Sequence, residues 1–193
     1  MSKRQYQLKQ RAVQQRQTRE RIVEATVALH QELGPKATTI SAVAERAGVQ
    51  RLTVYRHFPT ERDLFAACSS SFIARYPPPE LSALKARGAS ERTRAVLRAL
   101  YTYYGKTAEM WTSVYRDKDQ MPTVAEALEE FEDYLEAIKA DLLAEYAPYR
   151  SKRLRATLGH ALRFSTWQSL DAQGLGTRAM ADLVASWAAT AAQ

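Results

Sequence analysis

The sequence is poor in cysteine, glycine and proline: its 193 residues include one cysteine, Cys68, with seven glycines and seven prolines. A single cysteine excludes an intramolecular disulfide and a metal cluster with several cysteine ligands. Long apolar runs are also missing, because the longest charge-free stretches, 64–74 and 183–193, are about half of what a membrane-spanning helix needs. The basic residues near the start are not followed by the apolar run of a secretory signal. These absences favour a cytoplasmic protein.

The positive charge is concentrated in the first third of the chain. Residues 1–62 contain twelve Lys or Arg and five Asp or Glu, which accounts for the whole net charge of +7, and the remaining residues are neutral in sum. This distribution is typical of a polyanion-binding part joined to a neutral part with another task. Charge alone also fits a basic surface that only keeps the protein soluble.

Enzyme signatures are missing. The sequence has no glycine-rich phosphate loop, no His-Glu-x-x-His pattern and no nucleophile elbow. Its three histidines, His30, His57 and His160, lack metal-ligand spacing, and we expect His160 to be a hydrogen-bonded core or pocket residue. The carboxylates within 126–133 alternate with apolar positions, which fits a solvated helix face better than an acid–base pair. We therefore expect no catalysis, no metal and no cofactor.

Glycine and proline divide the chain into segments with helical periodicity and without the alternation of strands. We therefore expect an all-α protein. The expected helices span 18–33, 39–47, 50–58, 60–76, 90–105, 107–117, 122–146, 150–172 and 177–191. Residues 1–16, rich in Gln, Lys and Arg, are expected to form a loose arm or a frayed helix start. Three consecutive prolines at 77–79 mark the expected domain boundary.

The segment 40–58 has the pattern of a helix-turn-helix. Gly48 can adopt the positive φ that a tight turn between two short helices requires. Val43, Ala47 and Val54 are apolar where the two helices must face each other. The second helix would present polar side chains suited to phosphates and base edges, and such a helix fits a major groove. An ordinary helical hairpin would share the apolar pattern but not the surplus charge.

Residues 18–65 resemble the amino-terminal domain of the TetR family of bacterial transcriptional regulators. The matching residues are Gly34, Thr39-Ile40, Ala44, Ala47-Gly48-Val49, Tyr55, His57-Phe58 and Asp63-Leu64. The rest of the chain matches only in layout, as about five helices. The resemblance implies a three-helix head, a connecting helix, and a helical ligand-binding and dimerisation domain. The corresponding boundaries are 17–59, 60–76 and 77–193, with residues 1–16 as a basic arm.

The resemblance also implies which residues contact DNA. Thr39 and Ser41 would bind phosphate at the start of the second helix, and Tyr55 and His57 would anchor the third helix on the backbone. The other members would face bases or nearby phosphates. The complete expected set is Thr39, Ser41, Gln50, Arg51, Thr53, Tyr55, Arg56, His57 and Thr60. The arm would either contact the minor groove or phosphates, or remain a solvated tail.

Three positions depart from the family pattern. Position 50 is Gln where a capping Ser is common, and position 52 is Leu where a small residue is usual. Position 61 is Glu where a phosphate-binding Lys is common. Because Glu61 would repel phosphate, the contact passes to Thr60 or Arg62, or is lost. These departures leave the fold expectation unchanged and alter the base contacts.

The remaining helices carry two further sets of candidates. Aromatic residues combine apolar walls with hydroxyl groups, which suits a pocket for an amphiphilic small molecule, although ordinary core packing uses them as well. The expected ligand set is Tyr101, Tyr104, Trp111, Tyr115, Phe131, His160, Phe164 and Trp167. The last two helices carry broad apolar surfaces that suggest a dimer interface, although these could be the most buried helices of a monomer. The expected dimer set is Leu158, Leu162, Leu183 and Trp187.

These observations favour a homodimeric, ligand-responsive repressor that binds a pseudo-palindromic DNA operator. Its expected partners are double-stranded DNA, a small apolar or amphiphilic effector and a second copy of the chain, with no membrane. Two alternatives stay open: an architectural DNA-binding protein without an effector, and an all-helical enzyme whose basic end only aids solubility.

Overall fold

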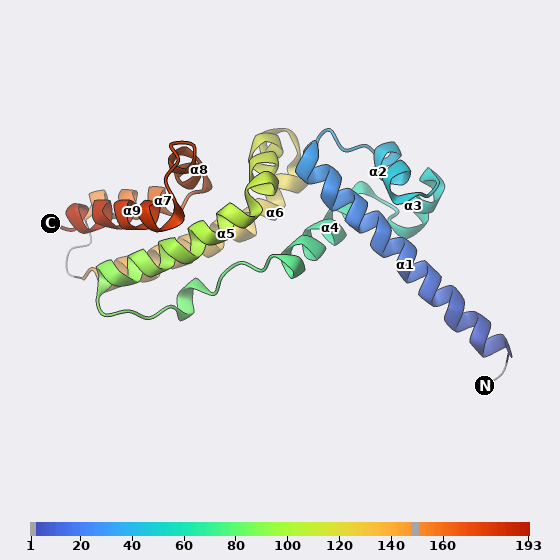
Figure 1. Ribbon diagram of the computed structural model, residues 1–193, viewed down its shortest axis with the longest axis horizontal. Helices are drawn as coiled ribbons and strands as arrows, with labels where there is room; N and C mark the ends of the chain where they lie inside the picture. Colours follow the sequence, from blue (N-terminus) through green and yellow to red (C-terminus); the bar gives the residue numbers. More distant parts are fainter. Residues whose placement is uncertain (1–2, 148–150) are drawn as a thin grey trace. The chain divides into compact units, whose positions relative to one another are not determined.

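The computed structural model describes residues 3–147 and 151–193, and in this part of the chain it contains helices and loops but no strand (Figure 1). The all-α expectation is confirmed. The α-helices are α1 (Lys3–Glu32), α2 (Ile40–Ala47), α3 (Arg51–His57), α4 (Glu61–Arg75), α5 (Ala89–Asp117), α6 (Pro122–Glu145), α7 (Lys152–Ala161), α8 (Phe164–Asp171) and α9 (Thr177–Ala191). Short 3-10 helices, η1 (Leu81–Ala83) and η2 (Lys118–Gln120), precede α5 and α6. None of the described helices has a stretch apolar and long enough to cross a bilayer.

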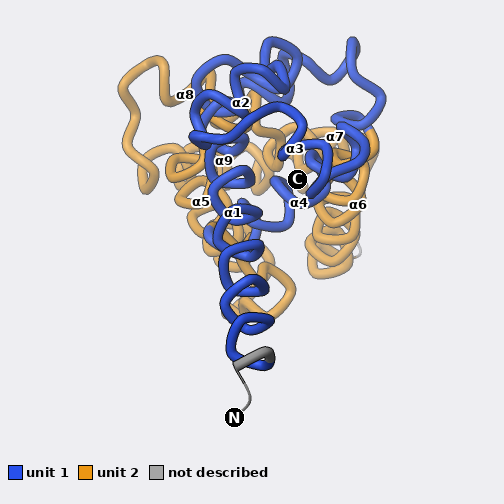
Figure 2. The backbone as a smooth tube through the Cα atoms, turned by 90° about the vertical axis from the view of Figure 1, so that its right-hand side faces the viewer, with its two compact units in different colours: residues 1–75, 112–125 blue, residues 76–111, 126–193 orange. Residues whose placement is uncertain are grey.

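The chain forms two compact units, coloured separately in Figure 2. Unit 1 contains Met1–Arg75 and Thr112–Ala125, and unit 2 contains Tyr76–Trp111 and Glu126–Gln193. Unit 1 thus combines α1 to α4 with the end of α5 and the beginning of α6. Unit 2 holds the rest of α5 and α6 together with α7 to α9.

The core of unit 1 forms where the second half of α1 packs on α2 and α4. Ile22 of α1, Val43 of α2 and Val54 of α3 are completely buried, and Leu64 and Phe72 of α4 are nearly so. Removing this apolar surface from water is the main force that fixes the short helices α2 and α3, because helices of this length are unstable alone.

Helices α1 and α5 are both longer than expected from the sequence. Helix α1 begins at Lys3, so residues 3–16 of the expected arm are helical; residues 1–2 lie outside the described part. The helices expected at 90–105 and 107–117 are one continuous helix, α5. Gly105 lies inside α5 without ending it, since one glycine costs a helix interior only about 1 kcal/mol, and the nearby Tyr104 and Thr107 are buried.

The helix expected at 150–172 is interrupted, and its expected first residue, 150, lies outside the described part. Arg163 adopts an extended conformation, with φ −74° and ψ 143°, between α7 and α8. The carbonyl groups of Ala161 and Leu162 accept hydrogen bonds at 2.8 Å from the hydroxyl groups of Tyr101 and Tyr104. Side chains of α5 therefore satisfy backbone groups that a continuous helix would have paired within itself.

Polar contacts in unit 2 hold the proline-rich segment before α5. The Tyr134 hydroxyl donates to the Pro79 carbonyl at 2.6 Å and accepts from the Leu81 amide at 2.9 Å. The Arg92 guanidinium, almost completely buried, pairs with Glu145 at the end of α6. Because buried charges require partners, this pair fixes the start of α5 against α6.

Candidate nucleic-acid interface

The turn between α2 and α3 has the geometry that the sequence predicts. Gly48 lies in the left-handed region, with φ 63° and ψ 42°. Its amide donates to the Glu45 carbonyl at 3.1 Å, and the Val49 amide donates to the Ala44 carbonyl at 2.9 Å. These two hydrogen bonds form the Schellman motif, which ends a helix and redirects the chain. The motif lets α3 begin only three residues after Gly48.

Helix α2 is fixed at both ends. The Thr39 hydroxyl accepts a hydrogen bond from the Ala42 amide at 3.2 Å and so caps the first turn. In the last turn, the Arg46 guanidinium makes two bonds of 2.5 and 2.7 Å to the Glu32 carboxylate of α1. The paired guanidinium lowers the pKa of Glu32. Arg46 is therefore part of the α1–α2 contact, while Thr39 and Ser41 remain exposed at the start of α2.

Helix α3 presents its polar residues to solvent. Arg51 and Arg56 are exposed, and Thr53 and His57 are half-buried. Gln50, just before the helix, is exposed and makes no capping bond with its side chain. Only Val54 points fully inward among the helix residues, at 0% exposure. The expected base-reading residues thus share an accessible surface.

Two exposed apolar residues complete this surface. Leu52 is 67% exposed and Tyr55 is 40% exposed. An exposed leucine near the start of a short polar helix gains nothing from the core of its own unit. In a major groove, an apolar side chain at this place can contact the methyl group of thymine.

Thr60 and Asp63 form a reciprocal cap at the start of α4. The Asp63 amide donates to the Thr60 hydroxyl at 3.1 Å, and the Thr60 amide and hydroxyl donate to the Asp63 carboxylate at 3.1 and 2.8 Å. The Thr60 hydroxyl is therefore committed to the cap. Glu61 and Arg62 are exposed beside it, so with Asp63 the first turn of α4 carries two acidic residues and one basic residue.

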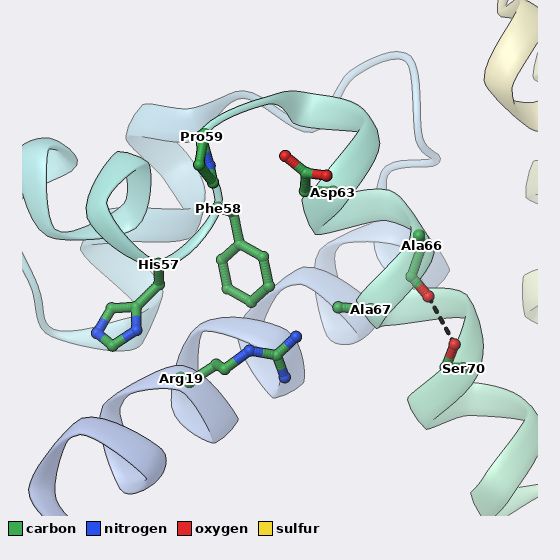
Figure 3. Close-up of a pocket in the computed structure, with 8 residues that line it drawn as sticks. All are labelled: Arg19, His57, Phe58, Pro59, Asp63, Ala66, Ala67 and Ser70. Atoms are coloured by element: carbon green, nitrogen blue, oxygen red, sulfur yellow. Dashed lines mark hydrogen bonds between the residues drawn. The ribbon is translucent and has the colours of Figure 1, made fainter. Parts of the chain in front are cut away.

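An open pocket of about 560 Å³ lies between α1 and α4, at the carboxyl end of α3 (Figure 3). Its lining includes Arg19, His57, Phe58 and Asp63. The guanidinium carbon of Arg19 lies 4.8 Å from the centre of the buried Phe58 ring, a cation–π contact. Arg19 therefore joins α1 to the end of the exposed helix.

A family model decides the assignment of this unit. Residues 22–68 match the model described as bacterial regulatory proteins of the tetR family. The chain carries a TetR-family amino-terminal domain. The matched range begins in the buried part of α1 and ends at Cys68 of α4, so it contains the whole helix-turn-helix.

Solved structures share this fold over most of the chain. A TetR-like transcriptional regulator from Rhodococcus sp. RHA1 aligns with a TM-score of 0.67 and 21% identity, covering 89% of this chain and 93% of that one. A TetR transcription regulator from Haloarcula marismortui aligns with a TM-score of 0.62 and 14% identity, covering 91% and 96%. The multidrug binding protein EbrR, complexed with imidazole, aligns with a TM-score of 0.56 and 19% identity, covering 88% of each chain. A comparison with curated proteins finds no match.

Five of the eight residues expected to bind a ligand meet in an aromatic cluster of unit 2, outside the TetR-family domain. The closest pair is Trp111 and Phe131, with ring centres 4.5 Å apart, and Tyr104 and Phe164 are 5.3 Å apart. The fifth, Trp167, lies 5.3 Å from Phe164. Tyr103, absent from the expected set, also belongs to this cluster.

Of the other three expected ligand residues, Tyr101 borders the cluster, and Tyr115 and His160 lie elsewhere. Tyr101 contacts the ring of Tyr104 but uses its hydroxyl on the backbone of α7. Tyr115 belongs to unit 1, where the Lys118 ammonium lies 5.5 Å from its ring. His160 is exposed on α7, so it is not the core residue that the apolar surroundings in sequence suggested; its imidazole lies on the polar side of the helix.

The Trp167 side chain brings a buried hydrogen-bond donor to the cluster. It is 5% exposed, and its indole Nε1 has no hydrogen-bond partner among the described residues. Leaving a buried donor unpaired costs about 1–3 kcal/mol. An acceptor atom supplied by a bound molecule would remove that cost.

The expected dimer residues divide into two groups. Leu158 and Leu162 are buried within unit 2, at 0% and 2% exposure, so their own chain already covers them. Leu183 and Trp187 are 38% and 37% exposed on α9. They are four positions apart and therefore lie on one face of that helix. An interface through this face would use the second pair and not the first.

Sequence reasoning missed the contacts that hold the α1–α2 turn. The Asp117 carboxylate accepts a hydrogen bond from the Lys36 amide at 3.0 Å, and the Arg116 guanidinium donates to the Leu33 carbonyl at 2.8 Å. These partners are more than 80 positions apart in sequence, so no local pattern could have revealed them. Arg19 was also missed, because its role depends on the tertiary position of Phe58.

Proposed function

We propose that this protein is a sequence-specific DNA-binding transcriptional regulator that acts in the cytoplasm as a homodimer, with residues 17–59 as its DNA-binding head. The observation that carries the proposal is the exposed face of α3, which carries Arg51, Tyr55 and Arg56. The turn at Gly48 fixes the start of this helix. The match to the TetR-family model over the same residues supports it.

In this proposal α3 enters a major groove. Arg51, in the first turn of α3, would donate two hydrogen bonds to a guanine, and Gln50 would pair with an adenine. Thr39 and Ser41 would bind phosphates beside the groove and fix the register of the head. Two heads of a dimer would read half-sites about 34–36 Å apart, so the operator should be an inverted repeat.

We further propose that a small apolar or amphiphilic molecule regulates DNA binding from the domain of residues 77–193. The aromatic cluster and the unpaired Trp167 indole favour a molecule with an apolar body and one hydrogen-bond acceptor. The fold accommodates a small molecule in EbrR, whose structure contains imidazole. Such an effector can shift the regulator only through its different affinities for the DNA-binding and released shapes.

The direct test of DNA recognition is selection from a random duplex library. The purified chain should enrich an inverted repeat, and the enriched duplex should bind more tightly than a scrambled one at physiological salt. Enrichment of no sequence above the starting library would remove the sequence-specific part of the proposal.

A second candidate, an architectural DNA-binding protein, is favoured by one observation: the exposed first half of α1 carries basic residues without any acidic neighbour. Such a protein would bind duplexes of any sequence through their phosphates. The same selection separates the candidates, because an architectural protein would retain DNA without enriching a motif.

The effector is tested by thermal shift against a small-molecule panel. A hit should raise the melting temperature of the wild type and release the selected duplex. The Trp167→Phe variant, which replaces the indole with a smaller aromatic ring and removes the N–H donor, should respond less to molecules whose acceptor pairs with that donor. An equal response of both proteins would exclude Trp167 from the ligand contact.

A further inference from the structure

The first half of α1 is an exposed helix that carries only positive charge. Residues 5–17 are all exposed, and residues 1–19 contain no Asp or Glu. In Figure 1 this part of α1 continues past the region where α1 meets α2, α3 and α4. A helix without a packing partner is usually marginal in water, so this segment contributes little to the core and is available to an external partner.

The charged side chains of this segment lie on one half of the helix. At 3.6 residues per turn, Lys9, Arg11 and Arg16 each lie within about 80° of the direction of Arg19. Arg19 in turn lies over the Phe58 ring at the end of α3 (Figure 3). The three cations therefore lie on the half of α1 that is centred on Arg19, the residue that contacts the end of α3.

The opposite half of residues 5–17 carries glutamines together with Tyr6 and Val13 and has no charge. The third exposed apolar residue, Leu8, projects from the charged half. A membrane-surface helix requires a continuous apolar face opposite its charges. Because the apolar residues here are few and divided between both halves, the segment fits a polyanion better than a lipid surface.

We propose that residues 5–17 of α1 form a second DNA-contact surface, which binds the phosphates that flank the site read by α3. The proposal rests on the proposed DNA-binding function and extends it. The segment is about 20 Å long at 1.5 Å per residue, which matches about six base-pair steps of 3.4 Å. Lys9, Arg11 and Arg16 supply the charge, and the sequence of the flanking DNA is not read.

The test compares two variants with the same change of charge. The first carries Lys9→Gln, Arg11→Gln and Arg16→Gln, which keep good helix formers in the arm. The control carries Lys152→Gln, Arg153→Gln and Arg155→Gln on α7, where all three cations are also exposed. Binding of each protein to a random-sequence duplex of about 40 base pairs is measured between 50 and 200 mM salt.

We expect the first variant, which lacks the three cations of residues 5–17 and is called the arm variant, to show a weaker dependence of DNA affinity on salt than the wild type. Each phosphate contact adds about −0.9 to the slope of log K against log salt, so three contacts add about −2.7. Between about 50 and 200 mM salt, the affinity of the wild type should therefore fall about 40-fold more than that of the arm variant. The control should follow the wild type. In addition, amide exchange of residues 5–17 in the wild type should slow when DNA is bound, since contact with DNA would stabilise the helix.

Equal slopes for the arm variant, the control and the wild type would overturn the inference while leaving the helix-turn-helix proposal intact. Binding of the wild type to anionic phospholipid vesicles, with equal slopes on DNA, would overturn it in favour of a membrane surface. Failure of the wild type to bind any duplex would instead overturn the proposed function on which the inference rests.

Discussion

The Asp117 carboxylate accepts a hydrogen bond from the backbone amide of Lys36 at 3.0 Å, although the two residues are 81 positions apart. Asp117 is the last residue of α5 and is almost completely buried, at 4% exposure. Burial opposes its ionisation, but hydrogen bonds from the Arg116 side chain and the Lys36 amide outweigh this effect and lower the pKa of Asp117. The end of α5 thereby fixes the turn between α1 and α2.

Asp117→Ala should destabilise unit 1 by about 2 kcal/mol. The substitution leaves the Lys36 amide without its charged partner and removes the counter-charge of Arg116, and a hydrogen bond to a charged group contributes about 1.5–3 kcal/mol. The free energy of unfolding from urea titration measures the effect. Asp119→Ala, at an exposed position two residues away, is the control, and equal stabilities of the two variants would exclude the proposed role of Asp117.

His30 makes the stability of unit 1 sensitive to acid. Burial among α1, α4 and the end of α5 lowers the pKa of His30 to about 4, and the negative charge of Asp117 offsets this only in part. The Nδ1 atom lies 3.4 Å from the Cys68 sulfur, and the pKa of that thiol is raised to about 12 by burial. The folded protein therefore holds His30 as the neutral imidazole down to about pH 4.

The unfolded chain takes up a proton at His30 near pH 6.5. The contribution of His30 to stability is therefore complete above pH 6.5 and is lost as the pH falls toward 4; by pH 5 the loss is about 2 kcal/mol. His30→Gln removes this titration, so the variant should show a flatter pH dependence of the free energy of unfolding between pH 6.5 and 4.5. Parallel curves for the variant and the wild type would argue against a neutral buried His30.

The hydroxyl of Tyr104 stabilises the break between α7 and α8. Tyr104→Phe leaves the buried Leu162 carbonyl without its hydrogen bond, and we expect a loss of about 1–2 kcal/mol in the free energy of unfolding. Tyr6→Phe removes a hydroxyl from an exposed tyrosine and should change stability little. If both variants unfold at the same urea concentration as the wild type, water replaces the Tyr104 hydroxyl in that role.

The fold could be predicted from sequence wherever local chemistry decides it. The helix-turn-helix was predicted correctly because Gly48 and the apolar Val43 and Val54 act within twenty residues of one another. The break near Arg163 was not predicted, because the tyrosines that stabilise it come from a helix about sixty residues earlier. Local patterns contain no record of such partners.

The candidate site shows the same division. The exposed residues of α3 follow from helical periodicity, since Val54 alone must face the core. Leu158 and Leu162 were expected in a dimer interface, with burial inside a monomer as the alternative, because periodicity shows that a helix face is apolar without showing whether the same chain or a second chain covers it.

Trp187→Asp should yield folded monomers. Trp187 is only partly covered in the single chain, at 37% exposure, so a charge there should leave unit 2 folded but disrupt an apolar dimer face. Sedimentation velocity should show half the mass of the wild type, with unchanged helical circular dichroism. Ile73→Asp, at an exposed apolar position on α4, is the control, and an unchanged mass for Trp187→Asp would place the interface elsewhere.

The central claim is that the exposed face of α3 reads DNA sequence, and Arg51→Ala tests it most directly. The measurement is the ratio of affinities for the selected duplex and a scrambled duplex at one salt concentration. Loss of a bidentate base contact, which is worth about 1–3 kcal/mol, should lower this ratio roughly 5- to 150-fold, whereas Arg153→Ala on α7 should leave it unchanged. An Arg51→Ala protein that discriminates between the two duplexes as well as the wild type does would contradict the account.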